Sequence, residues 1–274
     1  MPSVVDDLRT SAPTAARTIE YLSVPLRFTR EEAIKLLKEH VTPNGYNPAV
    51  LDLLRRTGTL RSYDGYLAIA DQTRLPVLAS LPLERLAAVA VAWQQEVERR
   101  NDDAHRALDA AYLGLLAAQE HGALELRAEF GRAEAAHATE RQAFVARLAQ
   151  QGASQYASLP DYAQASMYYV LGMSEYRRRS LSQAATYFQK AVATGARNQD
   201  VAIAGHLLAN YWARRRARWD DAEKLYKDSI KIGEDIGNRF SVAQSEHSYA
   251  NLLSQQRARW DDAEKLYKDS IKIG

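Results

Sequence analysis

RARWDDAEKLYKDSIKIG, the stretch at residues 216–233, returns unchanged at residues 257–274. The two copies are 41 residues apart, and a fixed period of this length predicts a series of similar structural units. A weaker copy lies upstream, where residues 181–192 align with residues 219–230 at a spacing of 38. The sequence therefore predicts three consecutive units between about residue 159 and residue 274.

Each unit is predicted to be a pair of helices. In the repeated stretch, apolar and small residues recur every three or four positions, which lines one face of a helix. Acidic residues occupy its first turn and Lys231 its last, as the helix dipole favours, and Gly233 is expected to end the helix. The predicted buried face consists of Trp219, Ala222, Leu225, Tyr226, Ser229 and Ile230.

These positions carry a family resemblance. Leu171-Gly172, Ala184, Phe188 and Ala191 have the spacing of the tetratricopeptide repeat, and the later units keep the pairs Ala222/Tyr226 and Ala263/Tyr267. The period and the acidic start of the second helix are most similar to the kinesin-light-chain subtype. The resemblance implies an α-solenoid over residues 159–274, in which the first helices line a concave groove that holds a peptide.

The first helices supply the candidate binding residues. Residues 201–215 and 242–256 differ at most positions but share a histidine and an asparagine, four residues apart. An asparagine amide offers donors and an acceptor, so it can pair with a peptide backbone. The alternative is that these side chains bridge neighbouring helices. The candidate peptide-binding residues are His206, Asn210, His247, Asn251 and, at the matching positions of the first unit, Tyr169 and Met173.

The histidines and arginines of these units allow two other interpretations, a metal site and a contact with an acidic partner, which the sequence supports less well than peptide binding. His206 and His247 suggest a metal site, but no carboxylate recurs beside them at ligand spacing, so we expect no metal. The arginines at 177–179 and 214–216 end the first helices, where cations suit the dipole, and we expect a solvated turn rather than a contact with an acidic partner.

The amino-terminal segment has a different pattern. Helix-like stretches cover residues 15–22, 30–39 and 48–56, and Thr29 with Glu32 forms a capping-box pattern before the second. Two short strands, 59–62 and 66–69, flank an Asp64-Gly65 turn. Three helices and a hairpin predict a winged helix within residues 1–82.

The same segment resembles the winged-helix module of STAND signalling ATPases, through residues 21–33, 53–60 and 64–71. In that family a Met-His-Asp-like triplet closes the module, and its histidine touches bound ADP. Here the triplet is Ile69-Ala70-Asp71, so this contact is missing. No glycine precedes a lysine, so the chain lacks a phosphate-binding loop and we expect no ATP hydrolysis by it alone. The resemblance implies an NTPase module upstream, or one that was lost.

A winged helix can also bind DNA through its third helix. Arg55, Arg56 and Arg61 would then contact the duplex. Residues 1–80 carry 10 basic against 9 acidic side chains, and phosphate binding favours a larger excess of cations. The apolar Leu53 and its neighbours Val50, Leu51 and Leu54 indicate a buried third helix instead, so nucleic acid is not the expected partner.

Residues 83–158 are alanine-rich and are predicted to form a helical connector. We expect helices over 83–100, 103–121 and 124–151, with breaks near Asn101 and Gly122. Alanine permits close helix packing.

Composition sets the remaining limits. The chain has 274 residues, 26% of them charged, a formal net charge of +2 and no cysteine. Asp6 and Asp7 stand where a signal peptide is basic, and no apolar run approaches the ~20 residues of a membrane helix, so we expect a cytoplasmic protein that contacts no membrane. No catalytic motif is present, and we expect neither an enzyme nor a cofactor. Gly274 closes a repeat without a polar capping helix, which favours a truncated array.

Together these observations predict an all-α chain with three parts: a winged helix with a small β-hairpin (1–82), a helical connector (83–158) and an α-solenoid of tetratricopeptide repeats (159–274). The expected function is a non-enzymatic sensor or adaptor arm of a STAND-like signalling protein that holds a peptide or protein in the groove of the repeats. The alternative is a transcription regulator with a DNA-binding winged helix and peptide-sensing repeats.

Overall fold

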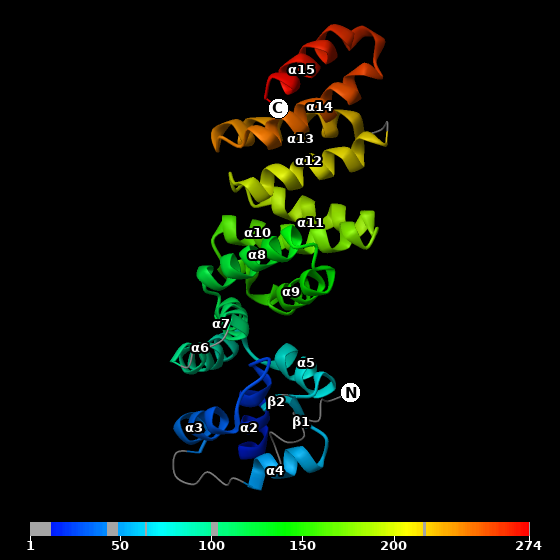
Figure 1. Cartoon of the computed structure of the whole chain (residues 1–274). Helices are drawn as coiled ribbons and strands as arrows, with labels where there is room; N and C mark the ends of the chain where they lie inside the picture. Colours follow the sequence, from blue (N-terminus) through cyan, green and yellow to red (C-terminus); the bar gives the residue numbers. More distant parts are fainter. Residues whose placement is uncertain (1–11, 43–48, 64, 100–103, 216–217, 274) are drawn as a thin grey trace. The chain divides into compact units, whose positions relative to one another are not determined.

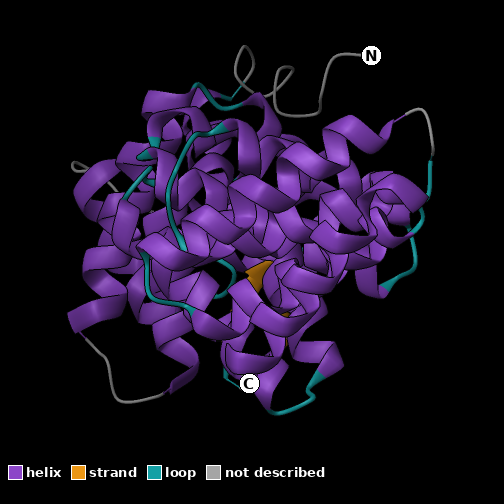
Figure 2. Cartoon of the chain, turned by 90° about the horizontal axis from the view of Figure 1, so that it is seen from above, coloured by secondary structure: helices purple, strands orange, loops and turns teal. Residues whose placement is uncertain are grey.

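The computed structural model describes residues 12–42, 49–63, 65–99, 104–215 and 218–273. Most of these residues are helical, and the strands among them form one two-stranded antiparallel sheet (Figure 2). The predominantly helical fold expected from the sequence is confirmed. Packing divides the chain into two compact units, Met1–Leu126 and Arg127–Gly274. The boundaries near residues 82 and 158 stay predictions.

The first unit contains the predicted short helices and the hairpin. Thr29 and Glu32 form the expected capping box, because each side chain bonds the backbone N–H of the other. In the hairpin Leu60 pairs with Ile69 and Tyr63 with Tyr66. Its elements are α2 (Pro13–Ser23), α3 (Arg30–His40), α4 (Ala49–Arg56), β1 (Leu60–Tyr63), β2 (Tyr66–Ile69), α5 (Asp71–Ser80), α6 (Leu83–Arg99) and α7 (Ala104–Leu116).

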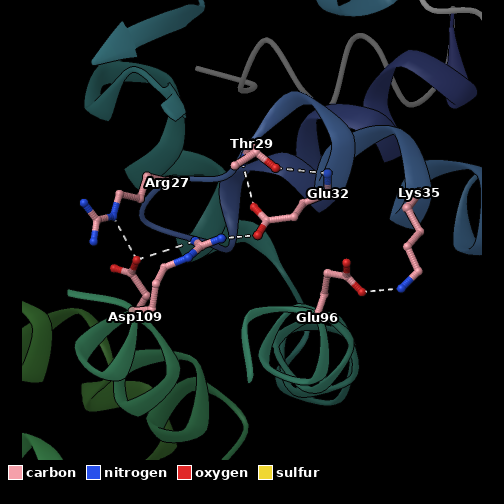
Figure 3. Close-up of polar contacts among 7 residues, drawn as sticks. Arg27, Thr29, Glu32, Lys35, Glu96 and Asp109 are labelled. Carbon is pink, nitrogen blue, oxygen red and sulfur yellow. Dashed lines mark hydrogen bonds and ion pairs between the residues drawn. The ribbon is translucent and has the colours of Figure 1, made fainter. Parts of the chain in front are cut away.

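Apolar packing and buried charges hold α6 and α7 against the segments that precede them. Trp93 of α6 is fully buried and donates its indole N–H to the Tyr21 carbonyl at 2.8 Å. Arg106 of α7 pairs with the carboxylate of Glu32, which has no exposed surface, and Arg27 donates to Asp109 at 2.9 Å (Figure 3). Breaking one half of such a buried pair strands a charge, so these contacts tie α7 tightly to the start of α3.

The connector differs from its prediction in the second half of its length. The break expected near Asn101 lies outside the described residues. The break expected near Gly122 falls at residues 117–119, where Ala118 has a φ of 56°. Gly122 itself lies inside α8 (Glu120–Ala135), where α7 approaches so closely that a Cβ would lie 2.4 Å from the backbone nitrogen of Leu115. The helix expected over 124–151 has a further break at His137, whose φ is 53°, and a separate helix, α9 (Thr139–Gln151), follows. The glycine is needed for close packing rather than for a turn.

The second unit continues as helices that pack in sequence order. Each helix from α10 to α15 lies against the next, and α12 also touches α10 and α14 (Figure 1). The 3₁₀ turn η1 (Ala153–Ser158) joins α9 to α10. The elements are α10 (Asp161–Arg177), α11 (Leu181–Ala193), α12 (Gln199–Ala213), α13 (Trp219–Asp235), α14 (Arg239–Ser254), η3 (Arg257–Arg259) and α15 (Trp260–Ile273).

The predicted helix face is buried in this unit. Ala222, Tyr226 and Ser229 of α13 are each at most 1% exposed. The expected stop at Gly233 is wrong, because α13 continues to Asp235. Gly233 instead packs against α14, where a Cβ would lie 2.8 Å from a methyl group of Val242, and the turn falls at Gly237, whose φ is 69°.

Within the described part of the chain, each helix is either too short or too polar to cross a lipid bilayer.

Candidate functional site

His206 and Asn210 lie one turn apart on α12 and share a hydrogen bond, at 2.9 Å between Asn210 Nδ2 and His206 Nε2. The Tyr226 hydroxyl of α13 donates to Asn210 Oδ1 at 2.6 Å, and the Tyr226 ring meets the His206 ring edge-on. The other imidazole nitrogen, Nδ1, lies 3.3 Å from Ser245 Oγ of α14. Three consecutive helices therefore meet at this pair.

These contacts fix the protonation of His206. Asn210 Oδ1 can only accept, so the Tyr226 hydroxyl donates to it. Asn210 Nδ2 can only donate, so His206 Nε2 must accept the hydrogen bond from it. The proton of a neutral ring then sits on Nδ1 and points at Ser245. Ser245 and Ser229 lie 3.0 Å apart, and Ser229 donates to the Ala202 carbonyl at 2.7 Å, which completes the chain of donors.

A charged imidazole does not fit this arrangement. Protonated Nε2 would face the amide N–H groups of Asn210, and the ring is only 7% exposed. Burial lowers the pKa of His206 from 6.5 to about 4. His206 is therefore neutral at pH 7 and serves as an internal bridge between α12 and α14.

His247 and Asn251 repeat half of this arrangement on α14. The Tyr267 hydroxyl donates to Asn251 Oδ1 at 2.6 Å, and the Tyr267 ring meets the His247 ring edge-on at 5.4 Å. Both His247 and Asn251 are exposed. The sequence repeat thus gives one buried and one accessible copy of the same side-chain arrangement.

The first-unit candidates, Tyr169 and Met173, are placed differently. Tyr169 is buried, and the guanidinium of Arg127 lies over its ring at 4.7 Å. Burial raises the pKa of the Tyr169 phenol above its usual range. Met173 is half-buried and packs against the core of the repeats. The structure does not bring these two residues together with the His206 pair.

Arg127 belongs to a polar cluster that sequence reasoning missed. Arg127 Nη2 donates to Asp200 Oδ1 at 2.8 Å and its Nε donates to Oδ2 at 3.1 Å, and Ser166 donates to the same carboxylate at 2.6 Å. The partners are 73 and 34 residues apart. No local sequence motif predicts such a cluster. Asp200 lies in the first turn of α12, where an acidic residue suits the helix dipole, and the N-cap of that helix is Asn198.

A surface hollow of about 120 Å³ lies beside Asn210, between the end of α10, the start of α11 and the end of α12. In the described part of the chain, the second amide N–H of Asn210 has no partner. The floor is apolar, and the rim carries an aromatic ring and a cation. Residues around it include Ala185, Phe188 and Leu207 in the floor and Asn210, Tyr211 and Arg214 at the rim.

The candidate DNA contacts Arg55, Arg56 and Arg61 are all exposed, the first two at the end of α4 and the third on β1. Burial of the whole apolar set of this helix was expected, and that is wrong for Leu53, which is 60% exposed. Leu51 and Leu54 face the core instead. The helix is amphipathic and leaves its basic end accessible.

No model of a protein family matches the chain, and comparisons with curated proteins and with solved structures also find no match.

Proposed function

We propose that the chain is a non-enzymatic protein-binding arm of a STAND-like signalling protein, with a winged helix at its start and an α-solenoid of tetratricopeptide repeats that holds a peptide. The repeat assignment rests on how the small residues pack. A Cβ on Gly172 would lie 2.4 Å from the ring of Phe188, and Ala184 and Ala191 are buried. Large residues do not fit where the repeat pattern requires small ones.

The winged-helix assignment is supported by the order of elements in the first unit. Three short helices precede a hairpin, and Phe28, between the first two helices, exchanges backbone hydrogen bonds of 2.8 and 2.7 Å with Leu67 of β2. This bridge adds a third extended segment to the two-stranded sheet. The cytoplasmic location stays a prediction from the amino-terminal sequence.

The hollow beside Asn210 carries the binding proposal. An apolar floor accepts a small aliphatic side chain, while the spare N–H of Asn210 can donate to a carbonyl of the same peptide. Arg214 is exposed at the rim and has no ion-pair partner in the described part of the chain. The hollow therefore suits a peptide that places an apolar side chain beside a carboxylate.

Selection from a random displayed peptide library on the full chain tests this proposal. We expect enriched peptides to carry an acidic residue next to an aliphatic one, and to lose binding to Tyr211→Ala and Arg214→Glu variants. Lys231→Glu is the matched control, because it makes the same charge change on an exposed side chain of α13. If Lys231→Glu reduces peptide binding as much as Arg214→Glu does, or if no peptide is enriched, the hollow is not a peptide site.

The DNA-binding alternative has one observation in its favour: Arg55, Arg56 and Arg61 are exposed together with Leu53. A salt-dependent shift of duplex DNA by the full chain, reduced by Arg55→Ala/Arg56→Ala, is expected under this alternative. The absence of any shift at low salt removes it.

A further inference from the structure

Arg147 of α9 lies at the edge of a second surface hollow, about 270 Å³ in volume, which is bounded by α9, α10 and α11. Its side chain is exposed and has no carboxylate partner in the part of the chain that the structure describes. An exposed arginine beside a hollow of this size is a candidate contact for an anionic ligand. This hollow is here called the Arg147 hollow.

Side chains from two helix faces form the Arg147 hollow. Residues 143, 146, 147 and 150 of α9 and residues 171, 174, 175 and 178 of α10 each follow the i, i+3, i+4, i+7 spacing of one helix face. The Tyr187 hydroxyl of α11 donates to Gln150 Oε1 at 3.0 Å, so α11 is joined to α9 across α10, which packs against both. Because Oε1 accepts this bond, the amide nitrogen of Gln150 stays available as a donor.

The Arg147 hollow is separate from the Asn210 hollow. Among the described residues, none lines both of them. On α11, Tyr187 borders the Arg147 hollow and Phe188 borders the Asn210 hollow. A ligand in the Arg147 hollow is therefore an addition to the peptide proposed above, and the two sites can be tested independently.

The Arg147 hollow has an excess of positive charge. Arg178 is paired with Glu175 at 3.3 Å, so these two charges offset each other. Arg147 is unpaired, and Lys190, whose Nζ lies 5.9 Å from the centre of the Tyr187 ring, is an exposed cation with no ion-pair partner among the described residues. A phosphate monoester carries about −1.5 to −2 charges at pH 7, whereas a carboxylate carries one. The charge of the hollow therefore favours a phosphoryl group.

Unpartnered donors and apolar surface lie in the same hollow. The Arg147 guanidinium, the Gln150 amide and the Ser174 hydroxyl donate no hydrogen bond to another described residue. A phosphoryl group has three strong acceptor oxygens, which such donors can satisfy. Leu171 and Ala146 supply the apolar surface, and each is 5% exposed. An aromatic ring suits this surface, because burying apolar area is favourable.

We propose that the Arg147 hollow binds a phosphotyrosine side chain of a partner protein. The phosphoryl group accepts hydrogen bonds from Arg147, Gln150 and Ser174, and the ring packs on Leu171 and Ala146. A phosphoserine and free phosphate bring no ring to this surface, and a carboxylate leaves one of the two unpaired cations without a counter-charge. Each of these three ligands should therefore bind more weakly.

Phenyl phosphate is the simplest probe of this inference, and the broadening of its ³¹P NMR signal measures binding to the full chain. We expect saturable binding that Arg147→Gln weakens at least tenfold. Arg239→Gln is the matched control, because Arg239 of α14 is also exposed and has no ion-pair partner in the described ranges. Arg239→Gln should bind phenyl phosphate as wild type does, and so should Arg214→Glu, at the Asn210 hollow. Absence of saturable binding, or equal binding by Arg147→Gln and wild type, overturns the inference.

Competition with phenyl phosphate identifies the ligand. A glycine-flanked phosphotyrosine peptide should displace it, whereas the matching phosphoserine peptide, inorganic phosphate and benzoate should each need at least a fivefold higher concentration. If inorganic phosphate or the phosphoserine peptide competes as well as the phosphotyrosine peptide does, the ring is not recognised and the inference is wrong. If benzoate competes equally, the hollow takes a carboxylate, which also contradicts it. Failure of the phosphotyrosine peptide to displace phenyl phosphate overturns the assignment to a partner protein.

Discussion

Acidification should weaken the repeats through one side chain, His206. Its pKa is about 4 in the folded chain and 6.5 in an unfolded one. Because the folded pKa is the lower one, the unfolded state binds more protons between these values, and stability falls as the pH falls from 6.5 to 4. The two pKa values together correspond to about 3 kcal/mol of folding free energy, of which about 2 kcal/mol is lost between pH 7.5 and pH 5.

Hydrogen exchange of the α12 and α13 amides, read by mass spectrometry at several urea concentrations, measures this loss locally. Carboxylates also begin to protonate at pH 5, so the His206→Gln variant supplies the reference. We expect wild type to lose about 2 kcal/mol more than His206→Gln over this pH range. His247→Gln, at the exposed copy, should behave as wild type. An equal loss in wild type and His206→Gln would refute the buried, neutral histidine.

Three further substitutions test the packing. Asn210→Ala leaves a buried phenol without its acceptor and should cost about 1–3 kcal/mol in thermal unfolding, whereas Asn251→Ala, in the exposed copy, should cost less than about 0.5 kcal/mol. Gly122→Ala forces α7 and α8 apart and should cost about 1–3 kcal/mol in urea unfolding. Glu32→Gln leaves the buried Arg106 guanidinium with Asp109, 3.8 Å away, as its remaining carboxylate and should cost about 3 kcal/mol, and adding Arg106→Met should restore part of that stability.

Features that are encoded by residues close together in the sequence could be predicted from it. The capping box at Thr29 and the hairpin at Asp64-Gly65 are each encoded within a few positions, and the 41-residue repeat encodes the buried face of α13. Periodicity of apolar residues is a local property, so these elements have the expected bounds to within a few residues.

Features that depend on contacts between residues far apart in the sequence could not be predicted from it. Gly122 and Gly233 have the sequence of helix stops but are needed where another helix passes close, and that helix is not visible in the local pattern. His137 takes a left-handed conformation that glycine adopts more easily.

At the candidate site, too, some features could be predicted from the sequence and others could not. The spacing of His206 and Asn210 placed them on one helix face, but the neutral state of the histidine depends on Ser245, 39 residues away. Its copy at His247 has the same neighbours in sequence and is exposed. Sequence therefore identified the side chains, and only the packing of α14 distinguished the internal bridge from the accessible copy.

The most direct test of peptide binding at the Asn210 hollow is photo-cross-linking. A library-selected peptide carrying a benzophenone beside its acidic residue is irradiated with the full chain, and the cross-linked positions are read by mass spectrometry. We expect cross-links within residues 207–213 of α12, at Arg214 and near Tyr176 of α10, and we expect Arg214→Glu to abolish them. Cross-links confined to residues 12–126, or unchanged by Arg214→Glu, would contradict peptide binding at this hollow.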